Sequence, residues 1–163
     1  MVSVVFLAAS CSETRSASVS QPAVIKGARS AYVVKHQDSS REIETYLKDA
    51  LNKKGVRAQA GPMSAKPANA DLQVTFVDRW HWDMTMYLRT LDVSVVDKSG
   101  REVATGTYRN SALHGYPDPQ KTSEELINLI YERANKSASL PLPAGPRQSR
   151  RGPVFFWGVS PRC

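Results

Sequence analysis

Residues 71–108 read DLQVTFVDRWHWDMTMYLRTLDVSVVDKSGREVATGTY, and this stretch decides the fold. Apolar and polar residues alternate from Leu72 onward, and Trp80 and Trp82 continue the same face of that alternation. A period of two is typical of a strand with one buried face. A second alternating run covers residues 87–96, and the turn-like sequence DKSG separates it from a third strand that ends the stretch. The stretch therefore predicts an antiparallel meander of three strands.

Two amphipathic helices are predicted on either side of this meander. The first has a capping-box pair in Ser39 and Glu42, apolar residues at helical spacing, and Gly55 where a helix-terminating glycine belongs. The second opens with another capping-box pair, Thr122 and Glu125, and carries an apolar stripe behind it. Each helix therefore has one apolar face that can pack on the sheet.

One folded domain is predicted to span residues 30–136. A strand at 30–36 precedes the first helix and a short strand at 56–59 follows it, which gives the element order β-α-β-β-β-β-α. This order predicts an α+β two-layer sandwich, in which a largely antiparallel sheet of about five strands carries two helices on one face. A segment of this length is ample for one hydrophobic core.

The charge of the chain is unevenly distributed. The 163 residues include 22 Lys+Arg and 15 Asp+Glu, for a formal net charge of +7. Residues 38–136 contain 14 basic and 14 acidic residues, so the positive charge belongs to the segments on either side. Nucleic-acid binding through these basic tails is a minor alternative, and we expect no nucleic-acid partner. No apolar run comes near the roughly 18 residues that a membrane-spanning helix needs.

The amino-terminal sequence MVSVVFLAAS, residues 1–10, followed by Cys11, resembles the end of a bacterial lipoprotein signal peptide. In that family, small residues precede an invariant cysteine whose sulfur receives a diacylglyceryl group before the signal is removed. The resemblance implies that residues 1–10 are a signal-peptide remnant, that Cys11 is lipidated, and that Ser12 directs the protein to the periplasmic face of the outer membrane. Ala8 stands where leucine is most usual and no basic region precedes the run, so a buried first strand with an incidental cysteine is the alternative.

Both flanks of the domain are predicted to lack a packed core. Residues 11–29, which start with the lipidated cysteine, are rich in serine and suit a flexible tether. Residues 137–163 contain five prolines, four arginines and no acidic residue, and are predicted to form a mostly disordered tail. The aromatic cluster Phe155, Phe156 and Trp157 in this tail either folds back on the domain, contacts lipid or a partner, or has no role.

No catalytic, metal or cofactor site is predicted. The three histidines, His36, His81 and His114, have no spacing that favours a metal site, and Cys11 and Cys163 are too few for a thiolate zinc site. The sequence has no nucleophile elbow, phosphate-binding glycine loop or nucleotide fingerprint. We therefore expect a protein that is not an enzyme and that takes no metal or cofactor.

A possible binding surface is formed by Trp80, Trp82, Met86 and Tyr87. Aromatic and methionine side chains bury large areas, so these residues extend the core if the helices cover them. If the strands project past the helices, the same side chains form an exposed apolar patch, which favours a partner or ligand surface.

The quoted stretch and the signal remnant resemble small lipoproteins of Gram-negative bacteria. More loosely, the element order is similar to small envelope modules such as the lipopolysaccharide-assembly lipoprotein and the amino-terminal domain of the Tol-system propeller protein. The resemblance implies an envelope-anchored, non-catalytic binding or assembly module, with the membrane as one partner through the lipid anchor and an envelope protein as another. The alternative is a small-ligand-binding or enzymatic domain that uses the Trp80–Tyr87 surface.

Overall fold

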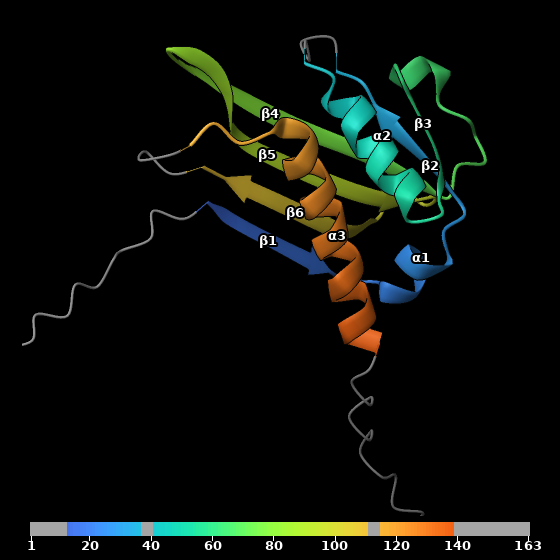
Figure 1. The fold of residues 1–163 in the computed structure, drawn as a ribbon. Coiled ribbons are helices and arrows are strands. Elements are labelled where there is room, and N and C mark those ends of the chain that lie inside the picture. The colour runs from blue at the N-terminus through green and yellow to red at the C-terminus, as the bar shows by residue number, and fades with distance from the viewer. Residues whose placement is uncertain (1–12, 37–40, 111–114, 139–163) are drawn as a thin grey trace, which may run out of the picture.

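The computed structural model describes residues 13–36, 41–110 and 115–138, which form two layers (Figure 1). One layer is a six-stranded sheet, and the helices that lie on it form the other. The elements in chain order are β1 (Thr14–Val19), α1 (Pro22–Gly27), β2 (Ser30–Val34), α2 (Ile43–Lys53), β3 (Arg57–Gly61), the 3₁₀ turn η1 (Met63–Ala65), β4 (Leu72–Asp83), β5 (Thr85–Asp97), β6 (Glu102–Arg109) and α3 (Pro119–Ala138).

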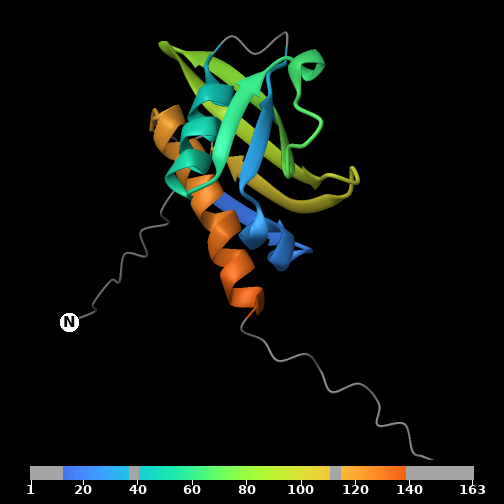
Figure 2. The same ribbon diagram turned by 90° about the vertical axis from the view of Figure 1, so that its right-hand side faces the viewer.

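The sheet is largely antiparallel, as predicted. Its strand order is β1-β6-β5-β4-β2-β3, and neighbours pair antiparallel from β1 to β4, while β2 pairs parallel with both β4 and β3. Helices α2 and α3 lie side by side on one face of the sheet (Figure 2). The α+β two-layer prediction is confirmed, and the structure adds one strand and one short helix at the amino-terminal end.

The structure corrects the predicted flexible tether, because residues 14–27 form β1 and α1. β1 pairs with β6 along its whole length. Every second residue of β1 faces outward, while Ala17 and Val19 between them pack against the core. Ile25 of α1 is fully buried. An edge strand needs backbone pairing more than large side chains, so a serine-rich sequence can occupy this position.

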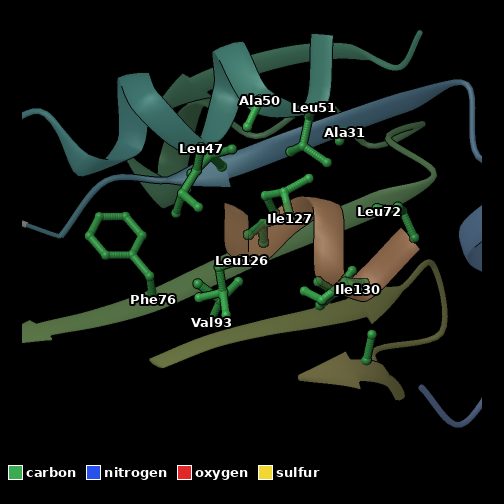
Figure 3. Close-up of a cluster of buried hydrophobic side chains, with 14 of the residues drawn as sticks. Ala31, Leu47, Ala50, Leu51, Leu72, Phe76, Val93, Leu126, Ile127 and Ile130 are labelled. Carbon is green, nitrogen blue, oxygen red and sulfur yellow. The ribbon is translucent and has the colours of Figure 1, made fainter. Parts of the chain in front are cut away.

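The core lies between the sheet and the two long helices (Figure 3). Each helix contributes one apolar stripe, and the sheet contributes the alternate residues that face the helices. The largest fully buried members are Ile43, Leu47 and Leu51 of α2, Leu126, Ile127 and Ile130 of α3, and Leu72, Phe76, Leu88, Leu91 and Tyr108 of the sheet.

Helix α2 ends as the sequence predicts but begins differently. Gly55 has a φ of 82°, and its N–H donates to the carbonyl oxygen of Asn52 at 2.9 Å, which closes the helix in the way that favours glycine. Glu42 has a φ of 59° and directly precedes the helix, where its side chain caps no backbone N–H. Ser39, the other member of the predicted capping box, lies outside the described residues.

Helix α3 begins at Pro119, four residues before the start at Ser123 that the predicted Thr122 cap implies. The Asp118 carboxylate accepts a hydrogen bond from the N–H of Gln120 at 2.9 Å, and the Asp118 carbonyl oxygen accepts one from the N–H of Thr122 at 2.9 Å. Thr122 is buried inside the first turn. Asp118 therefore caps the helix in place of Thr122, because proline suits the first helical position and aspartate suits the position before it.

Candidate interaction site on the projecting hairpin

The β4–β5 hairpin extends past the rest of the sheet (Figure 1). β4 and β5 stay paired as far as Asp83 opposite Thr85. On the other side of β5, the pairing with β6 reaches only Thr90. Residues 80–89 therefore form a two-stranded projecting hairpin, whose turn lies at Met84 with a φ of 58°.

A β-bulge marks the base of the projecting hairpin. The register shifts between Arg79 and Trp80, which leaves Arg89 as an extra residue on β5. The carbonyl oxygen of Arg89 accepts a hydrogen bond from the N–H of Asn110 at 2.9 Å. A bulge increases the local twist, so the hairpin bends away from the plane of the sheet.

Trp80 connects the base of the projecting hairpin to the core. Its side chain is half-buried and packs against the core cluster. The indole Nε1 donates to the Asp78 carboxylate at 2.6 Å, and the guanidinium carbon of Arg41 lies 4.9 Å from the centre of the ring. An arginine over an indole face is an attractive contact. Trp80 therefore extends the core, which is one of the two placements that the sequence left open.

Trp82 and Met84 lie at the exposed end of the projecting hairpin. Trp82 follows Trp80 on the same face of β4. The end of the β4–β5 hairpin extends past α2 and α3 (Figure 1). Trp82 is 68% exposed and Met84 is 86% exposed. Tyr116, from the segment that leads into α3, is 52% exposed. We call Trp82, Met84 and Tyr116 the apolar tip.

Two tyrosines hold the projecting hairpin in place. Tyr87 is only 3% exposed, and its ring meets the rings of His81 and Tyr116 edge to face, at 5.7 Å and 5.9 Å between centres. The Tyr116 hydroxyl donates to the carbonyl oxygen of Asp83 at 2.9 Å. The hairpin is therefore fixed by packing and by a hydrogen bond close to its turn.

The four residues predicted to form a binding surface lie on one hairpin, but their exposure differs. Trp82 is largely exposed, Trp80 and Met86 are half-buried, and Tyr87 is buried. Tyr116 joins them, and the sequence interpretation missed it because it belongs to a loop far along the chain. The sequence feature that could have indicated Tyr116 is its position between a glycine and a proline, where an aromatic residue is held in a turn-rich segment.

A hollow of about 420 Å³ lies on the face of the sheet away from the helices. It is lined by residues of β4, β5 and β6 outside the projecting hairpin, together with His36. Its two carboxylates pair with neighbouring groups: Asp92 binds Arg109 at 2.8 Å, and the Ser94 hydroxyl donates to Glu102 at 2.6 Å. These pairs satisfy the carboxylates without a ligand.

Two carboxyl groups with lowered pKa lie at the end of the sheet opposite the projecting hairpin. The Ser99 hydroxyl and the backbone N–H of Arg101 both donate to Asp97 and lower its pKa to about 2. Asp71 accepts a hydrogen bond from Lys98 at 2.7 Å, which is the largest cause of its lowered pKa. Asp97 closes the turn between β5 and β6, and Asp71 links that turn to the start of β2, so both carboxylates are engaged in structural contacts.

Several predicted features lie outside the described residues, namely Cys11, His114, Phe155, Phe156 and Trp157. Within the part of the chain that the structure describes, no group of three or more His, Cys, Asp or Glu side chains is placed to hold a metal ion. In the same ranges, each helix is too short or too polar to cross a membrane.

No protein-family model and no curated protein matches this chain. Among solved structures, it is similar to the PelC dodecamer from Paraburkholderia phytofirmans, with a TM-score of 0.52 and 16% identity, over 76% of this chain and 96% of that one. A single-substitution variant of the same PelC dodecamer gives a TM-score of 0.49 and 16% identity, over 76% of this chain and 97% of that one. At this level of identity the likeness shows that the two proteins share a fold.

Proposed function

We propose that this chain is a non-catalytic binding module of the bacterial cell envelope, held at the periplasmic face of the outer membrane by an acylated Cys11. The observation that carries the proposal is the exposure of Trp82 and Met84 at the end of a hairpin that is otherwise held firmly. Large apolar side chains gathered at one exposed place favour a contact surface. The projecting hairpin is therefore the surface that we assign to binding.

The shared fold supports an assembly role. PelC has this fold and is described as a dodecamer, so the fold is compatible with a protein that works by associating with others. In this chain, the carboxylates of Asp71, Asp92 and Asp97 are each paired with a basic side chain. Groups engaged in this way suit a structural role better than acid–base catalysis.

The amino-terminal sequence supports the lipid anchor. The position of β1 determines how close to the membrane such an anchor would hold the domain. Thr14, the first residue of β1, follows Cys11 by three residues. Three residues span at most about 10 Å, so an acylated Cys11 would keep the sheet next to the membrane surface. Two or more acyl chains make such anchoring stable, whereas one chain gives reversible binding.

The intact mass of the protein from its native membrane tests the anchor. The expected mass lacks residues 1–10 and includes the added acyl groups, and Cys11→Ala is expected to abolish both changes. Cys163→Ala is the matched control, because it removes the other cysteine and leaves the processing unchanged. An unmodified chain that begins at Met1 would contradict the anchored module.

Photo-crosslinking tests the binding surface. A photoreactive residue in place of Trp82 is expected to form adducts with an envelope component in cells. The control position is Arg57, which is also exposed but lies at the start of β3, at the opposite end of the sheet. Equal labelling from the two positions would contradict the assignment of the hairpin.

A further inference from the structure

We propose that the apolar tip is a second membrane contact, which lies in the headgroup region of the same bilayer that holds the acyl chains of Cys11. This inference rests on the lipid anchor of the proposed function. It names the component that the projecting hairpin meets, namely a phospholipid surface.

The direction of the strands places the start of β1 and the projecting hairpin at the same end of the sheet. β1 and β5 run the same way, since each pairs antiparallel with β6 between them. Thr14 and Thr90 both lie opposite Arg109, so the start of β1 is level with the base of the projecting hairpin. Figure 1 shows the start of β1 and the hairpin turn at the same end of the sheet. An anchor attached just before β1 therefore brings this end toward the membrane.

The projecting hairpin is long enough to reach a membrane that holds Cys11. From Thr90 to Thr85, the hairpin extends about 15 Å beyond the start of β1, at roughly 3.3 Å per residue. The three residues from Cys11 to Thr14 span at most about 10 Å. The hairpin turn therefore reaches at least as far along the strand direction as the anchor does. A domain held by Cys11 meets the bilayer with its hairpin.

The side chains of the apolar tip suit the interface between lipid and water. Tryptophan and tyrosine favour the interface between lipid and water, because their rings are apolar and carry one polar group. Trp82 presents such a ring on one face of the hairpin, and Tyr116, which packs on Tyr87, presents one on the other face. Met84, at the turn, adds a flexible apolar side chain. Asp83 lies beside them and is exposed, which limits the contact to the headgroup region. The hydrogen bond from Tyr116 to Asp83 means that this arrangement exists before contact.

The size of the apolar tip favours a bilayer over a second copy of the chain. A stable protein–protein interface buries about 800 Å² on each partner. An aromatic side chain supplies roughly 150–250 Å², so three side chains on a narrow ribbon fall short of that area. A lipid surface adapts its shape to a narrow projection, and the acyl anchor supplies the remaining affinity.

Quenching of tryptophan fluorescence by brominated lipids tests the contact. The full-length mature lipoprotein is placed in vesicles with phosphatidylethanolamine in excess over phosphatidylglycerol, with or without bromine on the acyl chains. Trp157→Phe is used throughout, so that only Trp80 and Trp82 emit. Brominated lipid is expected to quench part of the emission, and the further change Trp82→Phe is expected to abolish that quenching.

The matched control moves the emitting residue to the opposite end of the sheet. Arg57→Trp, combined with Trp82→Phe and Trp157→Phe, keeps two tryptophans and is expected to show no quenching by brominated lipid. Quenching that is the same with and without Trp82 would overturn the proposal. Iodide in the water quenches exposed tryptophan. If iodide quenched Trp82 less as the protein concentration rose, in the absence of vesicles, the proposal would also be overturned, and the tip would be assigned to a second copy of the chain.

A second preparation separates this proposal from the anchor. The Cys163→Ser chain, made without residues 1–10, has Cys11 as its single thiol and can be coupled to a maleimide lipid in the same vesicles. Quenching of Trp82 in this preparation supports the tip contact even if the native chain proves unacylated, in which case the proposed anchor alone fails. A natively acylated chain whose Trp82 escapes quenching overturns the tip contact and leaves the anchor standing.

Discussion

Gly106 of β6 shows how one missing side chain sets the distance between the two layers. A Cβ at this position would lie 2.9 Å from Cγ and 3.1 Å from Cδ1 of Leu126, and 3.2 Å from Cδ1 of Ile130. Both side chains are fully buried, so neither can move away without disturbing the core. Helix α3 therefore rests directly on the backbone of β6, and glycine is the residue that permits this approach.

Replacement of Gly106 by alanine is expected to destabilise the protein by roughly 1–3 kcal/mol, the usual cost of overpacking a core. Urea unfolding followed by circular dichroism measures this free energy. Gly27→Ala is the control, because nothing lies within 4 Å of a Cβ there. Its expected effect on the free energy of unfolding is below about 1 kcal/mol. Equal effects of the two changes would show that α3 does not rest on β6.

Trp80 and Trp82 show what the sequence can and cannot tell about a single residue. Their alternation with polar neighbours placed both side chains correctly on the face of β4 that the helices occupy. Whether a helix covers each ring depends on where the helix layer ends, and no local pattern in β4 contains that information. Trp80 packs against the core, whereas Trp82, two residues further on, is largely exposed.

At the scale of elements, β1 and α1 show why composition alone misjudged residues 14–27. The meander and the two long helices were predictable because their apolar residues repeat with strong local periods. β1 has no such strong signal, since four of its six residues are polar and its partner is the distant strand β6. Helix α1 has only six residues, and one of them, Ile25, is its sole buried residue. An element that is stabilised only by pairing with a distant strand leaves no pattern in the neighbouring sequence from which it could be predicted.

Ile25→Ala tests whether α1 belongs to the folded domain. The side chain is 1% exposed, so its truncation is expected to lower the free energy of unfolding by about 2–5 kcal/mol. Ser18→Ala on the exposed side of β1 is the control, with an expected change within about 0.5 kcal/mol. A flexible tether would make both changes neutral in chemical denaturation, which would contradict the structure.

At the scale of the whole molecule, carboxyl groups and a buried tyrosine set the pH range of stability. In the folded state, hydrogen bonds lower the pKa of Asp97 to about 2 and also lower that of Asp71, whereas burial raises the pKa of Tyr108 to about 12. In unfolded chains, the pKa of aspartate is about 3.9 and that of tyrosine is about 10. The two aspartates therefore stabilise the fold above about pH 4, and this stabilisation is lost as the pH falls toward 2. Tyr108 stabilises the fold below about pH 10, and its stabilisation is lost as the pH rises toward 12.

The free energy of unfolding is accordingly expected to fall on both sides of this range. Urea titrations at a series of pH values measure the two slopes. Asp97→Asn is expected to reduce the acid slope only, and Tyr108→Phe the alkaline slope only, so each variant serves as the control for the other. An acid slope that is unchanged in Asp97→Asn would show that the hydrogen bonds at this turn do not stabilise the folded state.

The pairing of β1 with β6 also fixes an order of events during folding. The two strands are far apart in the chain, with Thr14 opposite Arg109, so β1 has no partner until β6 has been synthesised. Closing so long a loop costs entropy before any stabilising contact forms, whereas a hairpin such as β4–β5 closes locally and early. Of the six described strands, β1 is thus the first to leave the ribosome and among the last to join the sheet. During that interval β1 is an unpaired strand, so an enzyme that acted at the proposed acylation site would meet an open polypeptide instead of a finished domain.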